Sequence, residues 1–435
     1  MVVNKKYFIF AEKIIVMKRV IDRQMLQGIQ DVLASSLGRI VVFTGARQVG
    51  KTTFVKHYFP AYEYISVEDP VASTEYGQLT ADMWHTAYPK AILDEVQKMP
   101  KLVESVKATY DRFDDVRYIL LGSSQILLLN KIKESLAGRC TIFSLYPLTL
   151  PELITQGTDN MVQMSPFQKI IKNGMSGAMF LPSFMFDKSY AVKMQQWQYY
   201  LRFGGYPKLT DKQLTDELRY EWLSDYVRTY LERDVRDLAM IRDLKPYVKL
   251  QQALAADTGQ ILNETSLSKA IGVTTKTVKN YLQYLSLSYQ TLILPSWSKN
   301  INKRLVKAPK IHYLDNGVVQ AVLKKRGGMT GNEFESLVVS EIYKQTNNIR
   351  ANVNFYHLRT HDGKEVDLLV ETQDGYYAFE IKMAERVSAT DARHLRNLQE
   401  FLDKPLLHSF LLSNDNQTHQ FSDSITAVSA AYFLG

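Results

Sequence analysis

The chain has 435 residues, of which 46% are hydrophobic and 23% charged, proportions that exclude a disordered or membrane-embedded protein. This length exceeds what one hydrophobic core can organise, so we expect two to four domains. The net charge of +8 and a pI near 9.1 bias the surface mildly toward polyanions without identifying nucleic acid as a partner.

Cysteine content and apolar runs indicate the compartment. The single cysteine, Cys140, excludes an internal disulfide and a cysteine-rich zinc site, and it suits a reducing compartment. No uninterrupted apolar run is long enough to span a bilayer. The apolar segment at residues 7–11 is cut short by Glu12 and Lys13, which makes it a poor signal peptide. The sequence therefore predicts a cytoplasmic protein with no membrane partner.

Residues 45–53 fit the pattern G-x-x-x-x-G-K-S/T. A short β-branched run before them predicts a buried parallel strand at residues 39–43, and the residues after them can form a helix. Glycines allow the backbone N–H groups to face phosphate oxygens, Lys51 would neutralise the β- and γ-phosphates, and Thr52 would bind Mg²⁺. The pattern predicts an ATP site that includes Gly45, Arg47, Gln48, Val49, Gly50, Lys51, Thr52 and Thr53.

Helical and apolar segments alternate around this stretch as in an α/β domain. We expect an amphipathic helix at residues 20–37 and strands at residues 62–67 and 91–93. The second strand runs directly into Asp94 and Glu95, and such a pair after a P-loop is typical of a Walker B element. Asp94 would hold Mg²⁺ through water, and Glu95 would polarise the attacking water.

Two further elements extend this site. A strand at residues 117–121 is followed by Ser123 and Ser124, either of which could sense the γ-phosphate or simply cap the next helix. Arg139 lies just before an apolar strand that begins at Cys140. From there it could reach the γ-phosphate of its own chain or of a neighbour, or it could be an ordinary surface arginine.

Seven segments together resemble the archaeal-type P-loop ATPases of the AAA+ superfamily that carry a C-terminal domain of unknown function. The matching segments are residues 45–53, 92–97 with Pro100, 121–124, 136–139, 203–207, 230–235 and 310–317. The resemblance implies an ATPase core, a helical lid, a winged helix and a nuclease-like C-terminal fold. Residues 158–196 are long for their position, and they predict an insertion.

The lid is expected around Gly204-Gly205-Tyr206-Pro207, which permits a sharp backbone turn and then fixes φ. By resemblance this turn would lie near the adenine and let the lid follow the nucleotide state. An ordinary interhelical turn explains the same residues equally well.

Helical spacing on either side of Gly272 predicts a helix-turn-helix. Its second helix would present Lys276, Lys279 and Asn280 outward, side chains suited to phosphates and base edges. The basic run at residues 299–310 could be a wing. Winged helices also serve as protein–protein lids, so contact with DNA and contact with a protein both stay open.

The last part of the chain holds a second set of acidic residues. Glu335 lies beside the apolar stripe of a predicted helix, where an unpaired carboxylate is costly. Strand alternation puts Asp367 on the polar face of a hairpin strand, and Glu380 and Lys382 share the corresponding face of the next strand. This order is that of PD-(D/E)XK nucleases. Asp367, Glu380 and Glu335 would bind Mg²⁺, and Lys382 would orient or deprotonate the attacking water.

The sequence thus predicts an α/β protein with an AAA+-type P-loop parallel-sheet core at residues 1–155. A helical lid with an insertion follows at residues 156–240, a winged helix-turn-helix at 241–325 and a C-terminal α/β PD-(D/E)XK nuclease-like domain at 326–435. We expect a Mg²⁺-dependent ATPase that acts on DNA as a homo-oligomer, since an Arg139 finger works best across a subunit interface. The alternative is a slow, ATP-dependent switch whose winged helix and non-catalytic C-terminal domain recruit a protein partner.

Overall fold

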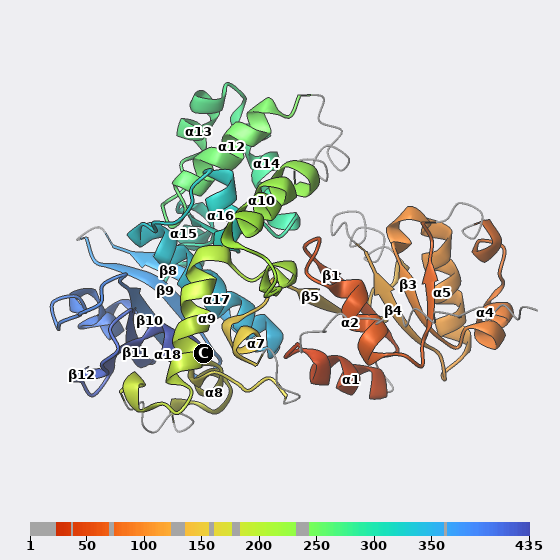
Figure 1. Cartoon of the computed structure of the whole chain (residues 1–435), viewed down its shortest axis with the longest axis horizontal. Helices are drawn as coiled ribbons and strands as arrows, with labels where there is room; N and C mark the ends of the chain where they lie inside the picture. The colour runs from red at the N-terminus through yellow and green to blue at the C-terminus, as the bar shows by residue number, and fades with distance from the viewer. Residues whose placement is uncertain are drawn as a thin grey trace, which may run out of the picture.

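The computed structural model describes residues 23–35, 38–68, 74–122, 135–155, 161–175, 183–231, 243–360 and 363–435. Figure 1 shows two lobes, a smaller one formed by the red and orange N-terminal elements and a larger one formed by the rest of the chain. No helix among the described residues is both long and apolar enough to cross a bilayer.

The first lobe is a parallel sheet of five strands in the order β2-β3-β4-β1-β5. Its strands are β1 (Ile40–Gly45), β2 (Glu63–Ser66), β3 (Lys90–Asp94), β4 (Arg117–Leu121) and β5 (Cys140–Leu145). Its helices are α1 (Leu26–Ala34), α2 (Lys51–Tyr58), α4 (Ala81–Ala87) and α5 (Pro100–Arg112). The five predicted strands are all present, and β4 and β5 begin where the sequence predicts.

Side chains that alternate along β1 pack against helices on both faces of this sheet. Val41 and Phe43 pack with α1 and α2, whereas Ile40 and Val42 pack with α4 and α5. All six residues of β1 are buried, as expected for a central parallel strand with both faces covered. The helix predicted at residues 20–37 is described as α1, which is shorter than expected.

The larger lobe contains a mixed sheet of six strands in the order β12-β13-β11-β10-β9-β8. These are β8 (Asn354–Arg359), β9 (Glu365–Glu371), β10 (Tyr376–Ile381), β11 (Leu406–Ser413), β12 (His419–Ser422) and β13 (Ile425–Ser429). Helices from both ends of the lobe's sequence pack against one face in a shared core. They are α7 (Leu150–Ile154), α8 (Pro166–Asn173), α9 (Tyr190–Phe203), α17 (Gly331–Asn348) and α18 (Ala430–Leu434).

A helical unit connects these parts. Its elements are α10 (Asp216–Tyr226), α12 (Lys245–Ala256), α13 (Glu264–Ile271), α14 (Thr275–Leu287), β6 (Thr291–Leu294), α15 (Ile301–Val306), β7 (Lys310–Tyr313) and α16 (Asn316–Val322). Gly272 adopts φ +75° between α13 and α14, and Thr274 caps α14. The basic run at residues 299–310, which could be a wing, lies between β6 and the start of β7, and these two strands pair with each other. It forms α15 and the start of β7, and the side chain of Lys310 is buried.

Two segments that match the AAA+ pattern separately meet at Asp315. Its Oδ2 accepts a hydrogen bond from the Gly205 N–H at 2.8 Å, and its Oδ1 caps α16 by accepting from the Val318 N–H at 3.2 Å. Burial raises the pKa of this carboxyl above its ordinary value. A Cβ on Gly204 would lie 2.1 Å from Asp315 Oδ1, so the two segments can approach this closely only because residue 204 is glycine.

We therefore expect Gly204→Ala to destabilise the protein by at least about 2 kcal/mol, because it adds a clash with a buried carboxylate to a backbone conformation that favours glycine. Gly272→Ala is the matched control. Its φ is also positive, but a Cβ there meets nothing within 4 Å, so it should cost only about 1 kcal/mol. Urea denaturation of both variants measures the difference. Equal losses would show that the Asp315 junction tolerates a side chain at residue 204.

Candidate functional sites

The P-loop leaves the carboxyl edge of the first sheet between β1 and α2. Gly45 has φ +146°, and a Cβ there would lie 2.2 Å from the Leu145 carbonyl oxygen. Gly50 is left-handed, with φ +91°, at the N-terminus of α2. Both glycines are therefore required by the backbone, and the turn directs the start of α2 toward the edge where β3 ends.

The structure brings the predicted magnesium residues together. The Thr52 hydroxyl donates to Asp94 Oδ2 at 3.0 Å, although the two residues come from different elements. The Lys51 ammonium donates to the Gly45 and Ala46 carbonyl oxygens, each at 2.8 Å, and so lies across the mouth of the loop. A hydroxyl and a carboxylate at a helix N-terminus, beside a lysine, form a donor set that fits Mg²⁺ bound to phosphate.

Tyr64 is a residue of this site that the sequence analysis missed. Its hydroxyl donates to Asp94 Oδ2 at 2.6 Å from the neighbouring strand β2. Burial, followed by the hydrogen bond and charge of Asp94, raises the pKa of Tyr64, so the phenol stays protonated as a donor. Asp94 Oδ1 accepts from the Glu95 N–H at 2.9 Å, so both carboxylate oxygens are fixed.

The Glu95 side chain is held by Gln97, two residues later in the sequence. It adopts a left-handed backbone conformation with φ +59°, and the Gln97 side-chain amide donates to Glu95 Oε2. Gln97 is buried, and its Oε1 has no hydrogen-bond partner among the described residues. This pair orients the carboxylate predicted to polarise water.

Two side chains from outside the P-loop donate hydrogen bonds to its backbone carbonyl oxygens. The Tyr226 hydroxyl donates to the Arg47 carbonyl oxygen at 3.2 Å and accepts from the Tyr206 hydroxyl at 3.0 Å. A guanidinium N–H of Arg23 donates to the Val49 carbonyl oxygen at 3.3 Å. The turn that contains Tyr206 therefore connects to the backbone of the loop through one tyrosine.

The predicted arginine finger lies at the wrong edge of the sheet to act on its own chain. Strand β5 pairs in parallel with β1, with Cys140 level with Ile40 and Leu145 level with Gly45. Arg139 therefore lies at the amino edge, about 20 Å from the P-loop edge at roughly 3.3 Å per residue. Its guanidinium forms a two-bond ion pair with Asp111, at 2.6 and 3.1 Å. The interpretation in which Arg139 reaches the γ-phosphate of its own chain is wrong for this structure.

The predicted sensor residues Ser123 and Ser124 lie outside the described residues. Strand β4, which precedes them, lies between β1 and β3 in the sheet. The carboxyl end of β4, at Leu121, therefore lies between the strand that precedes the P-loop and the strand that ends in Asp94.

The second predicted site lies in the larger lobe, where α17, β9 and β10 meet. The Lys382 ammonium donates to Glu380 Oε1 at 2.7 Å, and Asp367 Oδ2 accepts from the Ile381 N–H at 2.9 Å. Glu380 is only 3% exposed, and its Oε2 has no hydrogen-bond partner among the described residues. Burial, reinforced by the charge of Asp367, raises the pKa of Glu380 to about 7.

Lys310, the last residue of the basic run that could be a wing, lies within this acidic site. Its ammonium lies 2.9 Å from Glu335 Oε1, 3.1 Å from Glu365 Oε1 and 3.4 Å from Asp367 Oδ1. Burial alone would lower the pKa of Lys310, but the charges of these carboxylates raise it. Burial and the charge of Asp367 raise the pKa of Glu335 to about 8.

The predicted set of metal ligands is therefore not assembled around one point. In the part of the chain that the structure describes, no three Asp, Glu, His or Cys side chains converge to hold a metal ion. Glu335 and Asp367 instead face the ammonium of Lys310. As arranged here, these residues do not fit a bound metal ion.

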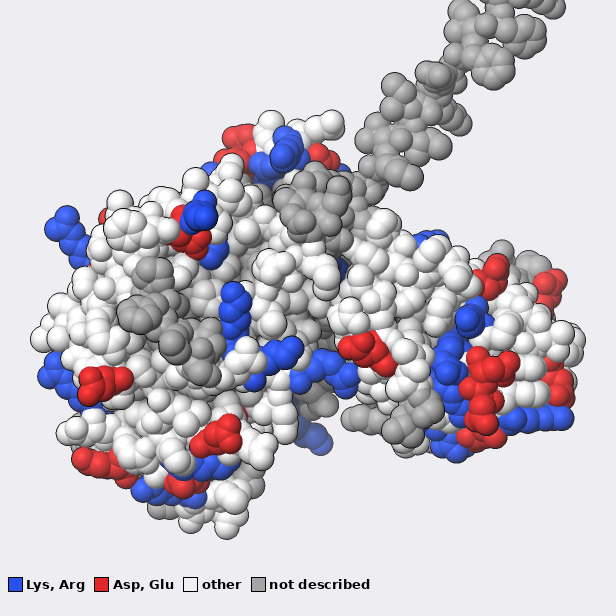
Figure 2. All heavy atoms as spheres, turned by 90° about the horizontal axis from the view of Figure 1, so that it is seen from below, with Lys and Arg blue, Asp and Glu red and all other residues white. Residues whose placement is uncertain are grey.

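The residues predicted to contact nucleic acid lie on the exposed side of α14. Lys276, Lys279 and Asn280 are all exposed, and Lys279 lies 3.5 Å from Glu264. On the face shown in Figure 2, Lys and Arg side chains also gather between the two lobes, whereas acidic and basic side chains alternate at the far end of the first lobe. The exposure agrees with the prediction, and it suits a protein surface as well as a phosphate backbone.

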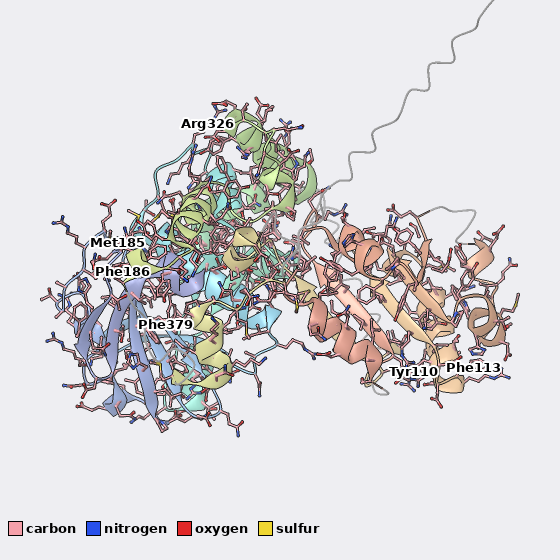
Figure 3. The ribbon with its side chains drawn as sticks, turned by 60° about the horizontal axis from the view of Figure 1, so that its bottom comes forward. Tyr110, Phe113, Met185, Phe186, Arg326 and Phe379 are labelled. Carbon is pink, nitrogen blue, oxygen red and sulfur yellow. The ribbon has the colours of Figure 1, made fainter. Side chains whose placement is uncertain are left out.

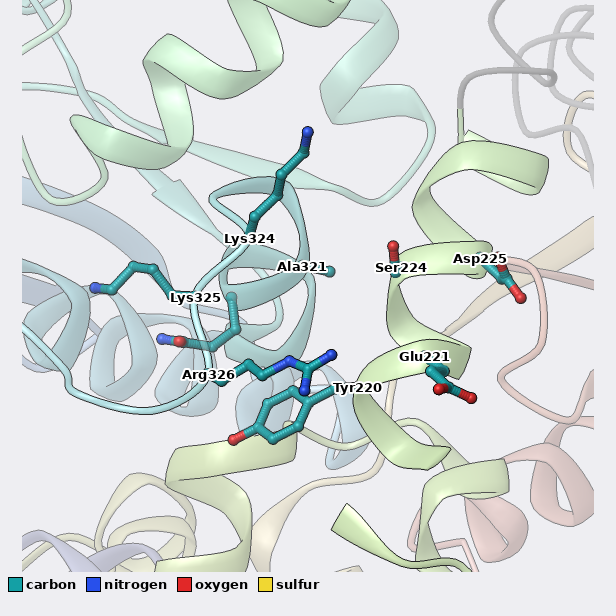
Figure 4. A pocket seen from close by; sticks show the side chains of 9 residues that line it. Tyr220, Glu221, Ser224, Asp225, Ala321, Lys324, Lys325 and Arg326 are labelled. Carbon is teal, nitrogen blue, oxygen red and sulfur yellow. The ribbon is translucent and has the colours of Figure 1, made fainter. Parts of the chain in front are cut away.

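Two surface features of the larger lobe lie outside these sites. A hollow of about 500 Å³ opens between α10 and α16, where Arg326 lies over the Tyr220 ring (Figure 4). Met185 and Phe186 are 60% and 82% exposed on the same lobe (Figure 3). Neither feature contains a residue that the sequence predicts to be functional.

Family models of known domains match three separate parts of the chain. Residues 37–154 match the family model of an AAA domain. Residues 194–327 and 330–433 match two domains of unknown function, DUF8612 and DUF4143. The first lobe is therefore an AAA-type P-loop ATPase domain with a parallel-sheet core, while the other two matches carry no support for DNA binding or nuclease activity.

Similar whole proteins come from mycobacteria and archaea. Uncharacterized proteins Rv2008c of Mycobacterium tuberculosis and Mb2031c of Mycobacterium bovis are each 26% identical over 408 residues, covering 91% of this chain and 81% of theirs. The Walker-type ATPase PABY2304 of Pyrococcus abyssi has 15% identity and a TM-score of 0.45, covering 70% of this chain and 96% of that one. The STAND protein PH0952 of Pyrococcus horikoshii, which has a tetratricopeptide repeat sensor, has 10% identity and a TM-score of 0.27, covering 72% and 44%.

We expect Tyr64→Phe to lower kcat for ATP by roughly three- to tenfold and to raise the Mg²⁺ concentration for half-maximal rate, because Asp94 loses a hydrogen-bond donor. The measurement is steady-state ATP turnover over a Mg²⁺ titration. Tyr62→Phe, two residues away, is the control and should leave both values unchanged. Identical Mg²⁺ curves for Tyr64→Phe and the wild type would show that Asp94 is positioned without the phenol.

Proposed function

We propose that this protein is a Mg²⁺-dependent ATPase that hydrolyses ATP at the carboxyl edge of its parallel sheet. The observation that carries the proposal is the 3.0 Å contact between Thr52 and Asp94 beneath a lysine-bearing P-loop. These two residues are 42 positions apart in the sequence, and their meeting is what a shared magnesium site requires.

Each residue of this site has its own role in the proposed hydrolysis of ATP. Backbone N–H groups at the start of α2 and the Lys51 ammonium would bind the β- and γ-phosphates. Thr52 and Asp94 would hold Mg²⁺, which supplies positive charge to the phosphate oxygens when bound. Glu95, held by Gln97, would polarise the attacking water, and Ser123 or Ser124 would sense the γ-phosphate.

Lys51→Ala should abolish nucleotide binding and leave the fold intact, because the hydrogen bonds of Lys51 described above go to carbonyl oxygens of the loop itself. Isothermal titration with MgATP measures binding, and thermal unfolding without nucleotide measures the fold. Lys101→Ala, an exposed lysine on α5, is the control and should bind as the wild type does. Normal ATP turnover by the Lys51 variant would refute the proposed site.

A second proposed function is Mg²⁺-dependent action on DNA by the C-terminal domain. Favouring it, Lys382 lies 2.7 Å from Glu380 at the end of β10, beside Asp367 on β9, which is the PD-(D/E)XK order. Exposed Lys276, Lys279 and Asn280 on α14 would contact DNA as part of a winged helix, and α10 would belong to the lid. Because the residues around Lys310 do not fit a bound metal ion in this conformation, no cleavage step is derived from it.

Oligomer formation is also part of this proposal. Arg139 lies at the amino edge of its own sheet, so it could reach a γ-phosphate only across a subunit interface. The Asp111 ion pair that holds it is solvent-exposed and therefore weak enough to exchange. In the alternative function, the same ATPase is a slow switch whose α14 face recruits a protein partner.

We expect the wild type, assayed with ATP, to cleave DNA in a Mg²⁺-dependent manner and Lys382→Ala to lose this cleavage, because the water then lacks its orienting ammonium. The assay uses single- and double-stranded DNA, and ATP turnover is measured with and without each on the same samples. Lys404→Ala, an exposed lysine of the same domain, is the control. Absence of cleavage, of salt-dependent DNA binding and of any DNA effect on ATP turnover would favour the protein-recruiting switch.

A further inference from the structure

The acidic site already contains a cation that belongs to the chain. Lys310 is 3% exposed, and its ammonium contacts one oxygen each of Glu335, Glu365 and Asp367, at 2.9, 3.1 and 3.4 Å. The lysine comes from β7 of the helical unit, whereas the three carboxylates come from α17 and β9 of the C-terminal domain. One domain thus supplies the counter-ion for the other.

Hydrogen bonds hold the backbone of β7, the strand that carries Lys310, firmly in place. On one side of β7, the Ile311 N–H donates to the Gln260 carbonyl oxygen at 3.0 Å, and the Leu262 N–H donates to Pro309 at 2.8 Å. On the other side β7 pairs with β6. The Tyr313 N–H also donates to Ser336 Oγ on α17 at 3.1 Å, one residue after Glu335. Because the backbone of β7 is held on both sides, Lys310 leaves the carboxylates either by a rotation of its own side chain or by a movement of β7 relative to α17.

A divalent ion cannot share these carboxylates with Lys310. Mg²⁺ would bind oxygens at about 2.1 Å, which would place two cations a few ångströms apart in a region with little water to screen them. Removing the ammonium without replacement is also unfavourable, because it leaves several buried carboxylates without a counter-ion. A divalent ion would therefore compete with Lys310 for Glu335 and Asp367, whereas Lys382 contacts only Glu380.

The site retains unused capacity for a metal ligand. Glu380 Oε2 is buried without a hydrogen-bond partner among the described residues, although Glu380 lies close enough to Asp367 for their charges to interact. A buried carboxylate oxygen without a donor is costly, and a cation is what would satisfy it. Lys382 satisfies only the other oxygen of this carboxylate.

We propose that the Lys310 ammonium occupies the acidic site in place of a metal ion, so that Glu335, Asp367 and Glu380 do not bind a divalent ion while Lys310 contacts Glu335 and Asp367. This inference rests on the proposed C-terminal metal site, and it adds the condition under which that site can be filled. The helical unit thereby keeps the site closed to metal in the conformation seen here.

The test is Mn²⁺ binding to the full-length, nucleotide-free protein, measured by isothermal titration and by the thermal unfolding midpoint with and without MnCl2. The wild type should show no Asp367-dependent Mn²⁺ site. Lys310→Met keeps the length of the side chain but removes its charge, so it should unfold at a lower temperature without Mn²⁺ and gain several degrees with it. Lys310→Arg keeps the charge and should behave as the wild type does.

Two further variants make the result specific and protect it against misfolding. The double variant Lys310→Met, Asp367→Asn should lose the Mn²⁺ effect, which assigns it to this site rather than to the P-loop. Glu365→Gln removes one partner of Lys310 without touching a proposed ligand. It should show Asp367-dependent Mn²⁺ binding that is weaker than in Lys310→Met, because the ammonium is held less tightly than in the wild type.

Failure of this inference about Lys310 and failure of the proposed C-terminal metal site give different results. Mn²⁺ binding by the wild type that depends on Asp367 and is as tight as in Lys310→Met and Glu365→Gln would overturn the role of Lys310 but support the metal site. No Asp367-dependent binding in any variant would overturn both this inference and the proposed C-terminal metal site. ATP turnover, measured on the same samples, reports separately on the proposed ATPase.

Discussion

The carboxylate of Asp315 joins the parts of this molecule that carry chemistry. It is buried, and it accepts backbone N–H groups from the Gly204-Gly205 turn and from the start of α16. On one side the turn continues into Tyr206, which reaches the P-loop backbone through Tyr226. On the other side Asp315 directly follows β7, which carries Lys310 into the acidic site. A shift at this carboxylate therefore has to move either the turn or β7.

Through this junction, a movement at the P-loop can be passed on to the acidic site. A P-loop that changes shape when it binds phosphate changes the position of the Arg47 carbonyl oxygen, to which Tyr226 donates. Packed cores respond to such small shifts by switching between discrete arrangements rather than by deforming smoothly. The interface between β7 and α17 suits such a switch, because it is made by polar groups, Lys310 with Glu335 and Tyr313 with Ser336, rather than by a continuous apolar core.

The parts of the fold that the sequence predicts well are those set by local pattern. The strands of the first sheet follow from apolar runs, and the meeting of Thr52 with Asp94 follows from parallel strands that share an edge. The sequence leaves open whether Arg139 acts on its own chain, because the answer depends on which end of β5 faces the P-loop, and this is known only from the strand register. Lys310 was missed for a similar reason. A lysine in a basic run predicts an exposed side chain, and its burial depends on carboxylates supplied 25 to 57 residues later.

The two sites satisfy their carboxylates by opposite means, and this difference determines how readily each admits a metal ion. Asp94 receives its hydrogen bonds from the neutral hydroxyls of Thr52 and Tyr64, which can rotate toward an incoming ion without any loss of charge. Glu335 and Asp367 receive theirs from an ammonium, so an incoming ion must first displace a positive charge that the strand holds in place. A metal ion that arrives with ATP can therefore enter the first site directly. Entry to the second site requires the Lys310 ammonium to move away from Glu335 and Asp367.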